Sequence, residues 1–444
     1  MQISITRMRR MRFREGEQDL PHSHSGSVKK ESFCRRAMKE WRGDSPPPPV
    51  HYQKSPIFQG QNSRMFSYDY DSDFRRKIEV APIDTIHYNP SNQITEDQML
   101  KIGIIGAGRL GSFHADKVAA HAGVELAGVA DPCEIARNGL AHKHGIQAFD
   151  SFDDMLPMVD AVIIASPTYL HYGLGNACLQ AGKHVLMEKP MCASLSEGRK
   201  LVATAQQKGL ILQVGHVEEF NPAWTAAKKS IRNDLMVGEP ILIDAVRTSG
   251  YTFRSTDVGT VFDMMIHDID LVLSLVASQV FSVDAIGFHI IGGPNEDVAH
   301  ARLRFDNGCA ANLFSSRVAD KAERKMRITT ATATVTVDFG TRTTTCHRAD
   351  ETVLEGKYAP NHVMPDSVAL LVPTFMKDAF SLETRTLDAV DALAEELDDF
   401  VCAILSHKIP RVPGSRALEA VSVAETIVRS IVRSSGHRET RRAA

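Results

Sequence analysis

The spacing of apolar positions changes near residue 222. Between residues 99 and 222, short β-branched runs alternate with stretches of helical period, the runs lying at residues 101–105, 124–130, 161–165, 184–187 and 211–214. Such alternation is typical of repeated βαβ units, whose parallel strands are buried on both faces. Ser194-Leu-Ser-Glu197 has the form of a capping box, and Gly209 follows where that helix should stop. We therefore predict a doubly wound parallel sheet over residues 99–222.

Beyond residue 222, strand-like runs follow one another with few helices between them. We expect strands at residues 241–249, 281–290, 297–305, 309–317, 326–338 and 341–348, and a helix near 264–277. Successive strands without crossover helices indicate an open, mostly antiparallel sheet. Two helices, about 387–406 and 415–434, close the chain. The second has a helical apolar stripe, which predicts packing against a core, with the first domain as a candidate.

Residues 1–98 keep neither a helical nor a strand period. Five arginines fall among the first fourteen residues, and four prolines occupy 46–49. Glu15, Glu17 and Asp19 are unlike the acid-poor composition of a transit peptide. We expect either a disordered tail or a mis-called start, since Met99 begins a run that suits the first strand of a domain. The predicted domains are thus 1–98, 99–222 and 223–444.

Length, charge and cysteines narrow the class of protein. The 444 residues exceed what one core usually contains. The formal charge of −3 gives no global basic field for nucleic acid, and no apolar run approaches the ~20 residues that span a bilayer. Seven scattered cysteines without a C-x-x-C pair suit reduced thiols in the cytoplasm better than a disulfide framework or zinc site. We expect no membrane, nucleic-acid or metal partner.

A glycine motif follows the first predicted strand. Gly106-Ala-Gly108-Arg109-Leu110-Gly111 matches G-x-G-x-x-G and opens a predicted helix, and Asp131 ends the second strand 20 residues later. The first glycine permits the tight turn, the second lets the backbone approach a pyrophosphate, and the third allows close helix–strand packing. An acid at position 131 accepts hydrogen bonds from ribose hydroxyls and favours NAD. Arg137 lies nearby and leaves NADP as the alternative.

Polar strings end the later strands, where ligands bind in open α/β sheets. They are Ser166-Pro-Thr168 with His171, Glu188-Lys189-Pro190, and Gly215-His216 with Asn221 just beyond. In the second domain, Asp263 and His267 are four residues apart on a predicted helix. Residues i and i+4 share one helical face, so an acid and an imidazole should project into one cleft.

In that order and spacing, these motifs resemble the glucose–fructose oxidoreductase, inositol dehydrogenase and MocA-like family. The resemblance runs from about Leu100 to the C-terminus. It implies a Rossmann domain joined to an α/β domain with an open antiparallel sheet, and an active site between them. It also implies that the glycine motif, Ser166, Thr168, His171, Glu188 and Lys189 face the cofactor. An uncovered sheet face needs a partner, and the family implies dimers or tetramers through that sheet.

Within the family, three strings look most like UDP-N-acetylglucosamine 3-dehydrogenases. They are Gly-His-Val-Glu-x-Phe-Asn-Pro-Ala, Arg-Ser-Thr-Asp-Val at 254–258 and Met-Ile-His-Asp-Ile-Asp-Leu at 265–271. Those enzymes oxidise the sugar 3-hydroxyl before an aminotransferase installs nitrogen for lipid A. One position departs from the pattern: Glu219 stands where that branch has arginine, which reverses a charge near the expected active site.

Oxidising a secondary alcohol needs a base for the hydroxyl proton and a hydride acceptor. His267 can accept a proton at neutral pH, and Asp263 could orient its ring. Lys189 could hydrogen-bond the same oxygen, and the sequence does not decide which of the two is the base. His216 and Asn221 either line the pocket or, for Asn221, form a turn-stabilising Asx motif. Arg247 and Arg254, on a predicted loop, are candidates for a substrate diphosphate, with plain surface charges as the alternative.

Three functions are compatible with these residues. The first is an NAD-dependent dehydrogenase of a sugar or nucleotide-sugar, most specifically of the 3-hydroxyl of UDP-N-acetylglucosamine. The second is a free polyol or inositol dehydrogenase of the same family. The third is a non-catalytic dinucleotide sensor that uses the arginine-rich tail as a docking arm, although Lys189, Asp263 and His267 favour an enzyme.

Overall fold

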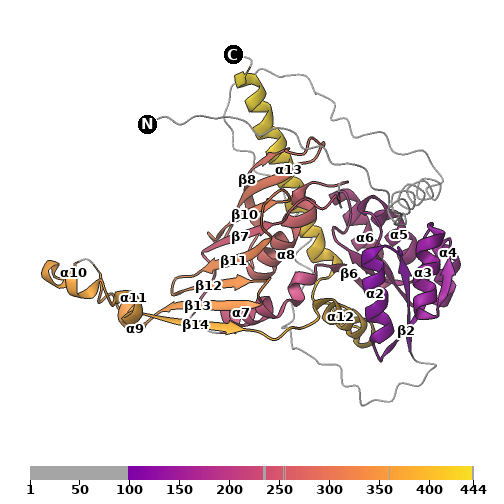
Figure 1. Ribbon diagram of the computed structural model, residues 1–444, viewed down its shortest axis with the longest axis horizontal. Coiled ribbons are helices and arrows are strands. Elements are labelled where there is room, and N and C mark those ends of the chain that lie inside the picture. The colour runs from indigo at the N-terminus through magenta and orange to yellow at the C-terminus, as the bar shows by residue number, and fades with distance from the viewer. Residues whose placement is uncertain (1–98, 234–236, 254, 256, 360, 443–444) are drawn as a thin grey trace, which may run out of the picture. The chain divides into compact units, whose positions relative to one another are not determined.

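A computed structural model describes residues 99–442 of the chain, apart from 234–236, 254, 256 and 360. The predicted N-terminal extension over residues 1–98 and the candidate Arg254 therefore lie outside the described residues. Figure 1 shows two sheets, each accompanied by helices. The predicted fold class is confirmed: a doubly wound parallel sheet is followed by an open, mostly antiparallel one.

The first sheet has six parallel strands in the order β3-β2-β1-β4-β5-β6. They are β1 (Leu100–Ile105), β2 (Val124–Ala130), β3 (Gln147–Phe149), β4 (Ala161–Ile164), β5 (His184–Glu188) and β6 (Leu212–Gly215). The helices of this part are α2 (Arg109–Ala120), α3 (Glu134–His144), α4 (Phe152–Met155), α5 (Thr168–Gln180) and α6 (Leu195–Lys208), with the short η3 (Leu156–Met158). Ile102, Ile104 and Ile163 are fully buried, as both covered faces require. The strand order reverses between β1 and β4, the switch point where such sheets bind ligands.

Local signals in the sequence set the helix ends. The Ser194 hydroxyl accepts a hydrogen bond from the Glu197 backbone N–H, and Gly209 ends α6 in the left-handed conformation with φ 64°. The three-residue strand β3 was not predicted, because so short a run carries no period. A connector follows β6, formed by η4 (Val217–Phe220) and α7 (Pro222–Asn233).

The second sheet has eight strands in the order β14-β13-β12-β11-β7-β10-β9-β8. They are β7 (Leu242–Thr248), β8 (Val280–Phe288), β9 (Val298–Phe305), β10 (Ala310–Ser316), β11 (Glu323–Thr329), β12 (Ala333–Asp338), β13 (Thr343–Ala349) and β14 (Phe380–Thr386). Neighbouring strands pair antiparallel except β7 and β10, which are parallel. Alternate residues such as Ala299, Ala301 and Leu303 are fully buried, so one face of the sheet packs on the core.

Two predictions for this part were wrong in detail. The single strand expected over 326–338 is the hairpin β11–β12, whose turn lacks glycine and proline. Thr330 makes that turn, because its hydroxyl accepts from the backbone N–H groups of Thr332 and Ala333. Strand β14 was missed, as were three short helices between β13 and β14: α9 (Glu351–Leu354), α10 (Pro365–Leu371) and α11 (Phe375–Asp378).

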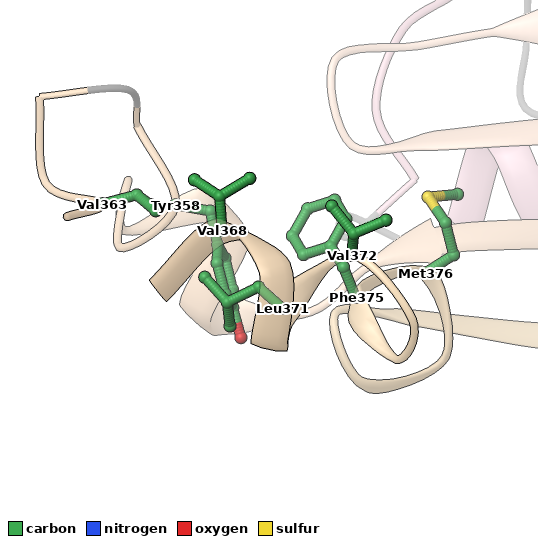
Figure 2. Close-up of a pocket in the computed structure, with 7 residues that line it drawn as sticks. All are labelled: Tyr358, Val363, Val368, Leu371, Val372, Phe375 and Met376. Atoms are coloured by element: carbon green, nitrogen blue, oxygen red, sulfur yellow. The ribbon is translucent and has the colours of Figure 1, made fainter. Parts of the chain in front are cut away.

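The segment between β13 and β14 contains an apolar pocket, which Figure 2 shows in close-up. Its lining consists of Tyr358, Val363, Val368, Leu371, Val372, Phe375 and Met376. Figure 1 places α10 beyond the ends of the flanking strands. None of the residues predicted to carry chemistry lines this pocket.

The terminal helix α12 (Ala392–Ser406) packs on α2 and η4, and α13 (Gly414–Arg442) packs on α6 of the first part and on β8 and α8 of the second. Glu425 of α13 accepts a hydrogen bond of 2.6 Å from the Leu195 backbone N–H at the start of α6. No helix within the described residues is long and apolar enough to cross a membrane. Five cysteines of the described part are free, namely Cys178, Cys192, Cys309, Cys346 and Cys402.

Candidate active site

The glycine turn after β1 has the geometry that its motif predicts. Gly106 has φ +104°, and a Cβ there would lie 2.5 Å from the Ala165 carbonyl oxygen. A Cβ on Gly111 would lie 1.7 Å from the Gly106 oxygen, so only glycine lets α2 pack this closely. A Cβ on Gly108 would meet no atom within 4 Å, which leaves room for a phosphate beside the N-terminus of α2.

Asp131 ends β2 beside this turn and is nearly buried. Its two carboxyl oxygens accept backbone N–H bonds of 2.7 Å from Ala107 and Cys133. Burial raises the pKa of Asp131, although these two bonds oppose the shift. Each oxygen keeps a lone pair for a ribose hydroxyl. Arg137 donates to the carbonyl oxygens of Asp131 and Pro132, which holds its guanidinium against the backbone.

The other predicted cofactor residues surround the same edge. Arg109 and Leu110 are exposed at the start of α2, and Thr168 begins α5. The Ser166 hydroxyl is buried without a hydrogen-bond partner among the described residues, as expected of a group that meets a ligand. The residues present therefore fit a dinucleotide.

His171 contacts the two loops that contain Ser166 and Pro190. Its Nε2 lies 2.9 Å from the Ser166 carbonyl oxygen and its Nδ1 lies 2.8 Å from that of Pro190. Burial lowers the pKa of His171, although both carbonyl groups oppose the shift. Both ring nitrogens face backbone carbonyl oxygens, and the neutral ring donates its single N–H to one of them, so its geometry suits positioning of the loops better than direct contact with a ligand.

Lys189 connects the first sheet to the second domain. Its Nζ donates to the backbone oxygen of Asp263 at 2.6 Å and to its carboxylate at 3.0 Å. The neighbouring Glu188 is buried and bonds His114 Nε2 at 2.9 Å. Burial alone would raise the pKa of Glu188, but the contact with His114 lowers it below its usual value. The peptide bond between Lys189 and Pro190 is cis.

Asp263 and His267 do not stack as the sequence predicted. Residues Val261–Met265 form η5, a single π-helical turn, and the α-helix α8 spans only Ile266–Leu275. A π-turn is wider than an α-turn, so residues four apart no longer lie one above the other. The described residues include no hydrogen bond between Asp263 and His267. Asp263 instead pairs with Lys189, and the Nδ1 of His267 is buried without a partner.

His267 is held neutral by its surroundings. Burial lowers its pKa well below the usual value, and Lys189, Arg247 and His216 lower it further. The ring of His216 meets that of His267 edge-on, with centroids 6.0 Å apart and an interplanar angle of 84°. Burial lowers the pKa of His216 also. Two neutral imidazoles thus lie beside the pair of Lys189 and Asp263.

Asn221 adopts the turn-stabilising alternative. Its side-chain oxygen accepts from the Ala223 backbone N–H at 3.1 Å, and its amide donates to the Phe339 carbonyl oxygen at 3.3 Å. This is the Asx arrangement at the start of α7. The amide therefore has partners within the protein.

Arg247 lies on strand β7 rather than on the predicted loop, and it is buried. Its Nε and Nη2 bond both carboxyl oxygens of Asp268 at 3.0 and 2.9 Å, and its Nη1 bonds Glu218 at 2.7 Å. We call these three residues the Arg247 cluster. Burial alone would lower the pKa of Arg247, but the two carboxylates raise it. With its charge already compensated, Arg247 is poorly suited to a substrate diphosphate.

Arg324 was not predicted as a site residue, and its side chain is more accessible to a substrate than that of Arg247. It lies on β11 directly opposite Arg247 in the strand register, and its side chain is 55% exposed. Its Nη1 is 3.9 Å from Glu218, and its charge reaches His267. The sequence carried one signal for this position. Side chains alternate along a strand, so Arg324 lies on the same face of β11 as the buried Met326 and Ile328, which is also the face of Arg247.

Glu219 has partners inside the protein. It accepts from Arg416 Nη2 at 2.8 Å, from Trp224 Nε1 at 3.1 Å and from Lys228 Nζ. Arg416 also binds Asp270 at 2.5 Å, and we call Arg416, Glu219, Asp270, Lys228 and Trp224 the Arg416 cluster. Burial alone would raise the pKa of Glu219, but Arg416 and Lys228 lower it to about 2. The charge reversal noted in the sequence is thus balanced by cations of this chain.

Metal ligands are not gathered in this region. Among residues 99–442, excluding the undescribed gaps, no group of three or more His, Cys, Asp or Glu side chains is placed to hold a metal ion.

Family models match both parts of the chain. The model for the oxidoreductase family with an NAD-binding Rossmann fold covers residues 100–216, and the GFO/IDH/MocA C-terminal domain covers residues 236–336. The chain is 33% identical over 324 residues to UDP-N-acetylglucosamine 3-dehydrogenase of Acidithiobacillus ferrooxidans, which covers 72% of this chain and 95% of that protein. It is 30% identical over 237 residues to scyllo-inositol 2-dehydrogenase (NAD(+)) of Bacillus subtilis, over 50% and 68% of the two chains.

Solved structures agree with these matches. The Acidithiobacillus ferrooxidans UDP-N-acetylglucosamine 3-dehydrogenase superposes with a TM-score of 0.65 at 31% identity, covering 75% of this chain and 98% of that one. Levoglucosan dehydrogenase in complex with NADH shares the fold, with a TM-score of 0.66 at 18% identity over 76% and 98% of the two chains. The chain is an NAD-binding dehydrogenase, and it belongs to the GFO/IDH/MocA oxidoreductase family.

Proposed function

We propose that the protein oxidises the 3-hydroxyl of a nucleotide-sugar, UDP-N-acetylglucosamine, to a ketone. The observation that carries the proposal is the group of Lys189, Asp263 and His267 at the carboxyl end of β5, in the same parallel sheet as the glycine turn, with the exposed Arg324 nearby. A relative of that name, 33% identical and covered over 95% of its length, supports the substrate. Glu219 does not oppose it, since that charge is balanced within the Arg416 cluster.

We assign the base to His267. NAD⁺, when bound, accepts the hydride from the sugar carbon. His267 is neutral and can take the hydroxyl proton, whereas Lys189 is already a donor in two hydrogen bonds to Asp263. An ammonium group has three N–H donors, so one remains for the substrate oxygen. Asp263 then serves to hold Lys189 in place rather than to orient His267.

We assign the contact with the substrate diphosphate to Arg324 in place of Arg247. A diphosphate next to the sugar ring calls for a guanidinium that is not already paired. The carboxylates of Glu218 and Asp268 occupy Arg247, while more than half of Arg324 faces solvent. His216 stays a candidate for the pocket wall because of its contact with His267.

The test compares substrates and two variants. We expect NADH formation with UDP-N-acetylglucosamine and little with myo-inositol at equal concentration. Lys189→Met and His267→Asn should each lower kcat by at least about 100-fold and leave NAD⁺ binding measurable by fluorescence titration. Turnover of myo-inositol alone would favour the second candidate, an inositol dehydrogenase, which the 30% identical scyllo-inositol relative supports.

We further propose that the protein forms a homodimer or homotetramer through the open face of the eight-stranded sheet. We also propose that it works in the cytoplasm and that its keto-sugar product is the substrate of an aminotransferase in lipid A synthesis. The sheet carries partly exposed apolar residues, including Ile286 on β8, and such faces generally need a partner. The free thiols agree with a reducing compartment. Sedimentation of a monomer at micromolar concentration would contradict the assembly. The domain boundary at residue 222 and the separate status of residues 1–98 also stay predictions.

A further inference from the structure

Buried polar atoms without partners concentrate behind the catalytic residues. Among the described residues they include Nδ1 of His267, both ring nitrogens of His216, Oε1 of Gln213 and both carboxyl oxygens of Glu396. Gln213 and Glu396 are fully buried, and His216 is 1% exposed. A native interior seldom leaves such atoms unpaired unless water or a functional role accounts for them.

These atoms belong to neighbouring residues. The ring of His216 meets that of His267 at 6.0 Å. Glu188 ends β5 and pairs in the strand register with Gly215, the residue before His216, and its charge acts on both His216 and Glu396. Gln213 on β6 donates to the backbone oxygen of Glu396 at 2.9 Å. We call His267, His216, Glu188, Gln213 and Glu396, together with Asp399, the polar seam.

Asp399 is where the polar seam reaches solvent. It lies three residues after Glu396 on α12, one helical turn along the same face, and its side chain is 20% exposed. Its Oδ2 accepts from the Arg411 backbone N–H at 2.7 Å. Burial raises the pKa of Asp399 to about 6, so this carboxylate exchanges protons close to neutral pH.

Glu396 is an uncompensated buried acid. An ionised carboxylate without hydrogen-bond donors is strongly disfavoured in a protein interior, and such a group is usually protonated instead. Burial raises the pKa of Glu396 well above its usual value, and the charges of Glu188 and Asp399 raise it further. The groups that face it are Glu188 with its partner His114, Gln213 on β6 and Asp399 on its own helix. Glu219 and Arg416, from the neighbouring η4 and α13, neutralise each other.

The surroundings of His267 favour release of a proton from its ring. Lys189, Arg247 and Arg324 all disfavour its charged form, so an imidazolium formed in turnover would be short-lived. We propose that the polar seam carries the proton released in alcohol oxidation from His267 through His216, Glu188 and the protonated Glu396 to solvent at Asp399, with internal water completing the gaps. The inference rests on the proposed role of His267 as the base.

The step balances without a further reactant. One proton leaves the substrate hydroxyl for His267, and His216, Glu188, Glu396 and Asp399 each pass on one proton for each one received. Gln213 carries no proton and only bonds the Glu396 backbone. Solvent takes the last proton, and every group returns to its starting state. Glu396 is a positioning and relay residue, since it touches neither substrate nor cofactor.

The first test replaces the relay group with a neutral isostere. Glu396→Gln keeps the shape and the neutral charge but cannot pass a proton on. We expect normal folding, KM within about twofold, kcat lowered about tenfold, and a larger solvent deuterium isotope effect on kcat. In stopped-flow with a pH-indicator dye, proton release should lag behind NADH formation. The matched control is Glu395→Gln, an exposed acid one residue earlier on the same helix, which should behave as wild type.

A second readout does not depend on turnover. Infrared spectroscopy of the free protein should show the carbonyl band of a protonated carboxylic acid, lost in Glu396→Gln and kept in Glu395→Gln. For Glu396→Ala, formate should restore part of the lost kcat by entering the space of the side chain.

The outcomes separate the two proposals. If the wild-type enzyme oxidises the sugar and Glu396→Gln has an unchanged kcat, pH profile and isotope effect, the polar seam is not a proton path. If no sugar is oxidised at all, the proposed function fails, and the infrared band still decides whether Glu396 is a buried acid.

Discussion

The Arg247 cluster and the Arg416 cluster are built from neighbouring residues yet face different parts of the molecule. Glu218 and Asp268 bind Arg247, and Glu219 and Asp270, one and two residues further along, bind Arg416. Arg247 comes from β7 and influences His267, whereas Arg416 comes from α13 and influences His216. One short turn and one helix thus supply acids to two guanidinium groups.

The two clusters show that the position of a charged residue in the sequence does not predict which residue it pairs with. Arg247 looked like a free cation for a phosphate, and Glu219 looked like a reversed charge in the substrate site. Both are buried members of ion clusters. Taking charges out of water is costly unless each meets an opposite charge, so the two clusters mainly fix the position of η4, α8 and their neighbours. The Arg247 cluster does this beside the catalytic residues.

The largest effect is expected from Arg247→Met. Glu218 and Asp268 would be left buried without a cation, which should lower the free energy of unfolding by about 3–5 kcal/mol. Asp268 follows His267 directly, so kcat should also fall at least about 100-fold in the protein that remains folded. Urea denaturation and initial rates of NADH formation measure the two effects. Loss of stability with normal kcat would show that the Arg247 cluster does not position His267.

Arg416→Met should separate stability from catalysis. The same physics predicts a loss of about 3–5 kcal/mol, because Glu219 and Asp270 lose their shared cation. Lys228 still binds Glu219, so the loss should fall at the low end of that range. We expect kcat to change less than tenfold. Arg429→Met, which removes the exposed partner of the largely buried Glu425 on the same helix, is the control and should cost under about 0.5 kcal/mol.

The sequence allowed prediction of the parts of the fold that carry a period or a local signal. The βαβ alternation, the glycine turn with Asp131, and the end of α6 at Gly209 follow from backbone geometry and nearest neighbours. The turn at Thr330 and the short β3 carried no such signal. The π-turn at Val261–Met265 changes which residues share a face, and no spacing rule for α-helices reveals it.

Long-range pairing explains what the sequence left out of the site. Lys189 and Asp263 are 74 residues apart, and Arg416 and Glu219 are 197 apart. Whether a side chain is free for a substrate depends on such contacts. Arg324 could be ranked above Arg247 only once Glu218 and Asp268 were placed.

The decrease in the free energy of unfolding at acidic pH should depend on Glu219. Its pKa is lowered from 4.5 to about 2, so it contributes stability that is present above pH 4.5 and is lost as the pH falls toward 2. The shift corresponds to about 3 kcal/mol. Glu219→Gln should therefore be less stable than wild type at pH 7, and the difference should shrink as the pH falls. Urea midpoints between pH 7 and pH 3 measure it. Glu355→Gln, an exposed acid, should run parallel to wild type, and a parallel Glu219→Gln curve would refute the assignment.

The smallest effect is expected from Arg324→Ala, which tests whether the unburied neighbour of the Arg247 cluster recognises the substrate. Its side chain is more than half exposed, so stability should change by under about 0.5 kcal/mol. Loss of one charge-assisted contact should raise KM for UDP-N-acetylglucosamine about tenfold, and Arg324→Lys should recover part of it. Arg327→Ala, on the same strand with its side chain on the opposite face, should leave KM unchanged. Because added salt screens an exposed charge, the wild-type KM should rise with ionic strength while that of Arg324→Ala stays nearly flat. An equal response of both enzymes to salt would mean that Arg324 does not meet the diphosphate.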